Sequence, residues 1–200
     1  MKLIGVTQRV EIIQEYSEKR DSLDQKWFEF LNKCDLIPIL LPNNLEAAKN
    51  MINSLKIEGI LLTGGNNLAK CGGDAYERDE LEKFCMNFSI KNNIPVLGVC
   101  RGMQFIQDYF GLSLELVKGH IARKQKITFY NKEEVVNSFH NWGCRETNDE
   151  LVAVGNSEDG VIKAVKHVKY RILGIMWHPE RINPFAKRDI KIFKEFFGVE

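Results

Sequence analysis

A cysteine between two glycines, placed where an apolar run gives way to a helical pattern, most constrains the fold of this chain. Residues 95–99 read as a buried strand, and Met103, Ile106 and Phe110 recur afterwards at helical spacing. Cys100 lies between them in the pattern Gly-x-Cys-x-Gly, typical of a nucleophile elbow, a sharp turn that holds a reactive side chain out of the backbone. A helix N-terminus would favour its thiolate. The alternative is an unreactive cysteine buried beside a turn.

The first half of the chain alternates between strand and helix patterns. Continuous apolar runs predict strands at 3–6, 36–41, 59–62 and 95–99. Apolar residues at helical spacing predict helices at 23–34, from a cap at Asn43 or Asn44 to Leu55, at 76–92 and after Cys100. Strands that are apolar throughout are typical of a parallel sheet covered on both faces by helices.

The second half of the chain changes character. Residues 114–175 show short strand-like runs separated by turns and no convincing helix, so we expect antiparallel additions to the sheet and a return strand that leads to His178. A last helix is predicted at 184–197. We expect residues 1–200 to form a single domain, a three-layer α/β sandwich around a mostly parallel central sheet, because no linker or repeat divides them.

Composition excludes several classes of partner. Lysine and arginine total 28 against 27 aspartate and glutamate residues, so no charge excess draws the chain to nucleic acid or to an anionic membrane. We expect no signal peptide and no membrane-spanning segment, because the apolar runs are too short. Five cysteines without CxxC spacing favour free thiols in a reducing cytoplasm over disulfides or a zinc site. All but Cys100 are expected to be structural.

A histidine near the C-terminus completes a candidate catalytic set. A thiol nucleophile needs a base, and the base needs a group that orients it. His178 and Glu180 are two residues apart in what reads as the end of an extended strand, so both side chains would project to one side. One ring nitrogen of His178 would then face Glu180 and the other Cys100. Without Cys100, a histidine followed by proline would read as a turn residue.

These motifs resemble the class I glutamine amidotransferase-like family. The resemblance rests on Gly-Val-Cys-x-Gly-x-Gln at the elbow and on Trp-His-Pro-Glu near the C-terminus. Segments 4–9, 61–65 and 136–140 extend the resemblance along the whole chain, and the motifs occur in the order expected for the family. The resemblance implies a flavodoxin-like three-layer fold, and it implies that the active site lies at one edge of the sheet.

The resemblance also implies a mechanism. Cys100, His178 and Glu180 would form a triad that hydrolyses a γ-glutamyl amide through a glutamyl thioester. The backbone N–H groups of Gly65 and Arg101 would stabilise the oxyanion, and removal of one such donor typically lowers the rate by about 10²–10³-fold. No metal ion or organic cofactor is implied.

The resemblance to the family also implies candidate substrate-binding residues. Gln104 and the backbone around Asn137, Ser138 and Phe139 would hold the glutamate α-amino and α-carboxylate groups. Further candidates for the pocket are Gly64, His140, Arg9 and Trp142. Trp142 stands where relatives often have glutamine, and it either stacks on a flat ring or is buried. Without the family pattern, Gln104 would read as an exposed helix residue and the other polar positions as turn or loop residues.

Particular features point to one branch of the family. Arg101 and segments 76–79 and 137–140 are similar to the γ-glutamyl-γ-aminobutyrate hydrolases, which pass no ammonia to a synthetase partner. Over its length the chain looks like the γ-glutamyl-CDP-amidate hydrolases of capsular phosphoramidate synthesis. That resemblance implies a small-molecule substrate cleaved to L-glutamate and cytidine diphosphoramidate. The alternatives are γ-glutamyl-γ-aminobutyrate hydrolysis in polyamine breakdown, a non-catalytic domain and a glutaminase subunit.

Three further features leave alternatives open. A basic run comprises Lys118, Arg123, Lys124 and Lys126. It is either a solvated face or, together with Arg9, a lining of the pocket mouth that suits phosphate. Residues 66–74, rich in glycine and asparagine, either close over the substrate or form a fixed turn. We expect His120 and His167 on the surface.

Overall fold

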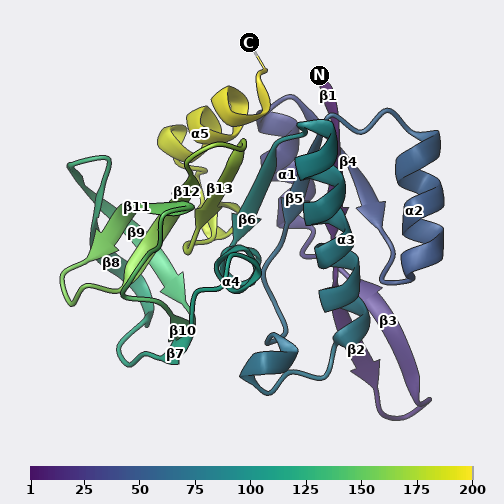
Figure 1. Ribbon diagram of the computed structural model, residues 1–200, viewed down its shortest axis with the longest axis horizontal. Helices are drawn as coiled ribbons and strands as arrows, with labels where there is room; N and C mark the ends of the chain where they lie inside the picture. The colour runs from purple at the N-terminus through teal and green to yellow at the C-terminus, as the bar shows by residue number, and fades with distance from the viewer. Residues whose placement is uncertain (200) are drawn as a thin grey trace.

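The computed structural model describes residues 1–199 and builds them around one large mixed sheet (Figure 1). The strand order is β4-β1-β5-β6-β13-β12-β11-β8-β9; neighbours run parallel from β4 to β13 and antiparallel from β13 to β9. The parallel half consists of β4 (Leu36–Leu41), β1 (Lys2–Thr7), β5 (Gly59–Leu62), β6 (Val96–Val99) and β13 (Ile172–Ile175). The antiparallel half consists of β12 (Ile162–His167), β11 (Leu151–Ser157), β8 (Ile121–Phe129) and β9 (Lys132–Phe139).

Helices cover both faces of this sheet. One hydrophobic cluster joins the sheet to α2 (Leu45–Ser54), α3 (Tyr76–Asn92) and α4 (Arg101–Tyr109). A second cluster on the other face joins it to α1 (Lys26–Lys33) and α5 (Lys187–Phe197). The antiparallel strands lie at one end of the molecule and α2 at the other (Figure 1). The predicted three-layer α/β fold with antiparallel additions is therefore confirmed.

The individual elements follow the predicted boundaries closely. The strands at 36–41 and 59–62 and the helix at 76–92 have the predicted ends, and the other predicted elements differ by a few residues. Asn44 caps α2, because its Oδ1 accepts a hydrogen bond from the N–H of Ala47 at 3.0 Å. Apolar content and capping chemistry were sufficient to predict these elements.

One hairpin was not predicted. β2 (Arg9–Ile13) and β3 (Glu18–Ser22) pair antiparallel, with Arg9 opposite Ser22. The sequence of β3, Glu-Lys-Arg-Asp-Ser, has no apolar residue and is mostly exposed, so it carries no burial pattern. The remaining short elements are η1 (Ala69–Cys71), β7 (Glu115–Leu116), β10 (Trp142–Gly143) and η2 (Pro179–Arg181).

The expectation that His120 and His167 lie on the surface is wrong, because each is 2% exposed. The ring centroids of His120 and His140 lie 5.0 Å apart, and those of His167 and Phe110 lie 4.6 Å apart. The His167 Nδ1 accepts backbone N–H groups from the turn after β12. The two ring contacts join segments far apart in sequence, which local patterns do not reveal. Among the described residues, no helix is long and apolar enough to cross a membrane.

Candidate active site

The turn between β6 and α4 holds Cys100 in a strained backbone conformation. Its φ of 53° and ψ of −104° lie outside the regions that non-glycine residues normally occupy. A Cβ at Gly98 would lie 2.5 Å from the Gly102 carbonyl, and one at Gly102 would lie 2.2 Å from the carbonyl oxygen of Leu62. The close approach of helix and sheet therefore requires both glycines. The strand–turn–helix predicted around Cys100 is present.

His178 is held by hydrogen bonds to its ring and to its backbone. Its Nδ1 lies 2.7 Å from Glu180 Oε1, and both residues are buried. Its backbone N–H donates to Asn137 Oδ1 at 2.8 Å, and its carbonyl accepts from Asn137 Nδ2 at 2.8 Å. The prediction that Glu180 continues an extended strand is wrong, because Pro179 begins the short helix η2 directly after His178. The turn still brings the carboxylate to the ring.

Cys100 and His178 meet beside Gly64. A Cβ at Gly64 would lie 2.7 Å from His178 Cε1 and 3.6 Å from Cys100 Cβ, so both side chains border the same point. Burial opposes charge on either group, but the pair stabilise each other as ions. Attraction to the thiolate, with hydrogen bonds to Cys100 and Glu180, outweighs burial and raises the pKa of His178 to about 9. Interaction with His178 and Arg181 outweighs burial and lowers the pKa of Cys100.

In the other four cysteines the pKa of the thiol is raised, not lowered. Burial raises the pKa of Cys71 and Cys85, and it raises the pKa of Cys34 and Cys144 to about 12. All are free thiols packed in the interior. Cys100 is therefore the thiol in this chain that is most easily ionised, and nucleophilic reactivity follows the thiolate.

Cys100 opens into a cavity of about 160 Å³. Its walls include the two expected backbone donors, Gly65 and Arg101. The Gly65 backbone has φ of +85°, and Arg101 is the first residue of α4. Neither N–H has an acceptor within residues 1–199; for Arg101 this is usual, because it lies in the first turn of a helix. Both donors remain available to an oxyanion beside Cys100.

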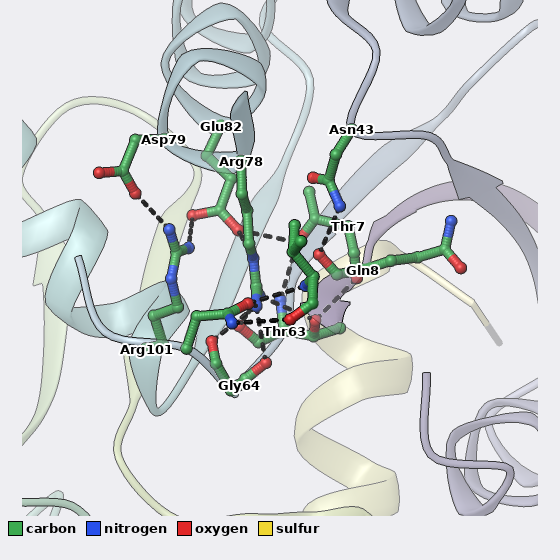
Figure 2. Close-up of polar contacts among 12 residues, drawn as sticks. Thr7, Gln8, Asn43, Thr63, Gly64, Arg78, Asp79, Glu82 and Arg101 are labelled. Carbon is green, nitrogen blue, oxygen red and sulfur yellow. Dashed lines mark hydrogen bonds and ion pairs between the residues drawn. The ribbon is translucent and has the colours of Figure 1, made fainter. Parts of the chain in front are cut away.

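A buried ion network lies behind these donors (Figure 2). Arg78, on α3, donates to the carbonyls of Thr63, Gly64 and Gly65 at 2.6–3.1 Å and to Glu82 at 3.0 Å. Consecutive carbonyls bound to one guanidinium fix the conformation of the loop that carries the Gly65 N–H. The prediction treated Arg78 only as a marker of a family branch, so its structural role was missed.

The same network reaches the elbow. The Arg101 guanidinium, 1% exposed, binds Glu82 and Asp79, both on α3 (Figure 2). Glu82 also accepts from the Thr7 hydroxyl at 3.0 Å. Two arginines and two carboxylates thus compensate each other's charge in the interior. Glu82 therefore binds both Arg78, which holds the loop that carries Gly65, and Arg101, which begins the helix after Cys100.

Four of the residues expected to bind the substrate lie around the cavity of Cys100. Gln104, Phe139, His140 and Trp142 line it. The Trp142 carbonyl accepts from Gln104 Nε2 and from His140 Nδ1, both at 2.9 Å. The Gln104 amide oxygen has no such partner within residues 1–199 and remains available. The side chains of Asn137 and Ser138 are bound elsewhere, and neither residue lines this cavity.

A buried lysine supports this wall. Lys163 Nζ lies 2.6 Å from His140 Nε2, 2.8 Å from His120 Nδ1 and 3.1 Å from Ser138 Oγ. Burial outweighs attraction to Asp159 and lowers the pKa of Lys163 to about 7. Burial and repulsion by Lys163 lower the pKa of His140 to about 3, so His140 is neutral and accepts at Nε2. Lys163 interrupts the apolar sequence Val-Ile-Lys-Ala-Val, a signal that could have revealed it.

Arg9 lies at a second cavity, of about 300 Å³, that shares Gly65, His178 and Arg181 with the first. The basic run does not join it. Lys118 and Lys126 line a third cavity beside His120 and Asp159, and Arg123 lines a fourth with Phe139 and Arg181. The sequence alternative in which the whole run and Arg9 form one pocket mouth is therefore wrong, because Lys118, Lys126 and Arg123 line cavities other than that of Arg9.

The loop at 66–74 is tied to its surroundings. The Asn66 carboxamide exchanges two hydrogen bonds of 2.9 Å with the Val10 backbone. The Ala69 N–H donates to Asp79 at 2.9 Å. These contacts favour the fixed turn over the closing loop.

Fold and site together define an α/β protein with a candidate thiol nucleophile and a His–Glu pair at the carboxyl edge of a parallel sheet. Residues 17–198 match the family described as glutamine amidotransferase class-I. The chain belongs to this family of enzymes. It is 35% identical over 201 residues to the γ-glutamyl-CDP-amidate hydrolase of Campylobacter jejuni, with 98% of each chain covered.

Other relatives agree on the family. A putative glutamine amidotransferase-like protein of Lactococcus lactis is 29% identical over 79% of this chain and 80% of its own. Among solved structures, a glutamine amidotransferase from Thermotoga maritima superimposes with a TM-score of 0.71, covering 97% of this chain and 83% of the other at 17% identity. At that identity the structure supports the fold alone.

Proposed function

We propose that this protein hydrolyses γ-glutamyl amides, with Cys100 as nucleophile, His178 as acid and base, and Glu180 as the group that orients His178. The observation that carries the proposal is the 2.7 Å contact between His178 and Glu180 beside a cysteine of lowered pKa. A reactive thiolate, a histidine able to carry a proton, and a carboxylate to hold it are the groups that acyl transfer requires.

The reaction begins with attack of the Cys100 thiolate on the γ-carbonyl carbon. The carbonyl oxygen becomes an oxyanion, which the N–H groups of Gly65 and Arg101 stabilise. The His178 imidazolium gives its proton to the amide nitrogen, the C–N bond breaks, and a glutamyl thioester remains. His178 then takes a proton from water, which attacks the thioester and releases L-glutamate and the thiolate.

The glutamyl group is proposed to lie in the cavity of Cys100. The Gln104 amide oxygen is suited to accept from the substrate α-ammonium group. Phe139 and Trp142 border the same space, and the Phe139 carbonyl lies 3.9 Å from Cys100 Sγ. Gly64 contributes by allowing His178 to approach, since any side chain there would displace the ring.

The proposed substrate is γ-glutamyl-CDP-amidate, cleaved to L-glutamate and cytidine diphosphoramidate in capsule synthesis. Similarity over 98% of the chain to an enzyme of that name supports this choice. A stand-alone hydrolase needs no synthetase partner and no cofactor, because both chemical steps use Cys100, His178 and water. We propose that the reaction takes place in the cytoplasm.

Release of L-glutamate by the purified protein tests this function. The panel consists of γ-glutamyl-CDP-amidate, γ-glutamyl-γ-aminobutyrate and L-glutamine. We expect fastest release from the first substrate and none in Cys100→Ala, whereas Cys71→Ala, a control of matched exposure and raised pKa, keeps full activity. Preference for the aminobutyrate amide would instead assign the protein to polyamine breakdown. Slow glutamine hydrolysis alone would indicate a glutaminase subunit.

A further inference from the structure

We propose that the second cavity, next to His178, is the subsite for the leaving group, and that Arg9 and Arg181 bind phosphoryl oxygens there. The inference rests on the proposed hydrolysis of a γ-glutamyl amide and assigns the part of the substrate beyond the scissile nitrogen. The ligand class is an organic diphosphate attached through nitrogen.

The cavity is built from segments distant in sequence. Its volume is about 300 Å³, at the lower end of the ~300–1,000 Å³ typical of small-molecule sites. The β2–β3 hairpin and the segment that leads into α1 form one wall. The other wall consists of residues 178–181 and of the loop at 63–65 that carries the Gly65 N–H, here called the oxyanion loop. Its ionisable lining residues are Arg9, Glu11, Asp24, His178, Glu180 and Arg181.

The direction of proton transfer places the leaving group in this cavity. In a γ-glutamyl amide the glutamyl chain and the leaving group lie at opposite ends of the scissile bond. With the acyl carbon at Cys100 and the glutamyl chain toward Gln104, the nitrogen must face His178 to receive its proton. The group attached to that nitrogen then enters the space beyond His178, which is the second cavity.

The two arginines lie where the charge of a phosphoramidate would fall. The phosphorus of such a substrate is one bond from the scissile nitrogen, so its oxygens lie close to His178. Arg9 packs on the oxyanion loop: a Cβ at Gly65 would lie 3.2–3.4 Å from Arg9 Cβ, Cδ and Nε. The Arg181 Cζ lies 5.3 Å from the centroid of the Phe139 ring, and its Nε lies 3.4 Å from Glu180 Oε1.

Both guanidinium groups are accessible to a ligand. The side chains of Arg9 and Arg181 are 47% and 40% exposed, and Arg9 pairs only with the half-exposed Glu11 at 3.3 Å within residues 1–199. Such exposed pairs contribute little, about 0–1 kcal/mol, so phosphate readily replaces the carboxylate. The planar guanidinium binds phosphate oxygens through two parallel hydrogen bonds. By contrast, Glu11 and Asp24 suit hydroxyl donors such as those of a ribose.

Substrate selectivity of arginine variants tests the subsite. We expect Arg9→Gln to raise the KM for γ-glutamyl-CDP-amidate about 10-fold or more, because a charge-assisted hydrogen bond is lost. Its kcat/KM for L-glutamine should change less than about 3-fold, since ammonia does not reach the cavity. Arg20→Gln, on β3 of the same hairpin and outside the cavity lining, is the matched control and should keep both values. Arg181→Gln should raise the same KM.

Arg181 also lowers the pKa of Cys100, so its variant tests two effects and Arg9→Gln is the cleaner experiment. Equal losses of Arg9→Gln on both substrates, or an unchanged KM for the nucleotide substrate, would overturn the subsite. Binding of CDP to the Cys100→Ala protein, measured by calorimetry, separates this inference from the proposed function. Arg9→Gln should weaken CDP binding about 10-fold, and no CDP binding at all would refute the subsite even if glutamine is hydrolysed through Cys100.

Discussion

At the scale of single residues, the proposed site depends on an ion pair in which each partner stabilises the charge of the other. Cys100 and His178 are both buried, and burial by itself would keep both neutral. The thiolate raises the pKa of the imidazole, the imidazolium lowers that of the thiol, and Glu180 adds a hydrogen bond to the charged ring. The reactive form is thereby stabilised before substrate arrives.

This coupling predicts the alkaline limit of activity. The His178 pKa is raised to about 9, so its acidic proton is present below that pH and lost above it. We expect kcat/KM for glutamate release to fall as pH rises through about 9. In Glu180→Gln the imidazolium loses a carboxylate partner, and the fall should move to lower pH. Identical alkaline limits in the two proteins would contradict this role of Glu180.

Arg78 predicts a second effect at the residue scale. Lysine keeps the charge but cannot donate to three carbonyls and Glu82 at once. We expect Arg78→Lys to lower kcat about 10²-fold, because a misplacement of ~1 Å in a catalytic group has effects of that size. KM should change much less. Arg145→Lys, in an exposed ion pair, is the control. A normal kcat in a folded Arg78→Lys protein would show that the loop that carries Gly65 keeps its conformation without Arg78.

At the scale of elements, the sheet brings the proposed catalytic groups to one edge. Cys100 follows β6, His178 follows β13, and Gly64 follows β5, which are neighbouring parallel strands. The carboxyl ends of such strands are where α/β proteins bind ligands. Helix α5 then secures the end of β13, because Trp177 Nε1 donates to buried Asp189 at 3.0 Å.

Packing between α1 and α5 predicts a large contribution to stability. Phe193 is fully buried and meets Phe30 edge to face, with ring centroids 4.8 Å apart. Phe193→Ala should lower the free energy of unfolding by about 3–5 kcal/mol, since a cavity remains where the ring was. Urea denaturation measures this, with exposed Phe28→Ala as the control. A loss below ~1 kcal/mol would mean that the two helices repack freely.

Elements were predictable where one local pattern decided them. β4 and β5 are apolar throughout, and α3 repeats apolar residues at helical spacing, so their ends were predicted correctly. β3 was missed because none of its residues is apolar. On α3, the charged residues Arg78 and Glu82 lie four apart on the face that carries buried Leu81 and Cys85. That pattern indicates a buried ion pair and could have revealed the network.

At the scale of the whole molecule, the antiparallel half of the sheet completes the site made by the parallel half. β9 supplies Asn137 and the backbone beside Cys100, and β12 supplies Lys163. The sequence predicted antiparallel additions but not which of their side chains turn inward. Burial of His120 and Lys163 depends on strand order across the sheet, which local periodicity cannot give.

The buried lysine predicts how global stability depends on pH. The Lys163 pKa is about 7 in the folded protein against 10.5 for an unperturbed lysine. Between these values the unfolded state binds more protons, so this group makes the free energy of unfolding rise with pH from about 7 to 10.5. Lys163→Met should flatten that rise in urea denaturation. Equal slopes in both proteins would mean that Lys163 stays protonated among His120, His140, Ser138 and Asp159.

The central claim is that Cys100 carries the glutamyl group during turnover. The most direct measurement is acid quenching of the protein mixed with γ-glutamyl-CDP-amidate, followed by peptide mapping by mass spectrometry. The account predicts one glutamyl group on the peptide that contains Cys100, and neither the adduct nor glutamate release in Cys100→Ala. A glutamyl group on another residue, or undiminished glutamate release by Cys100→Ala, would contradict it.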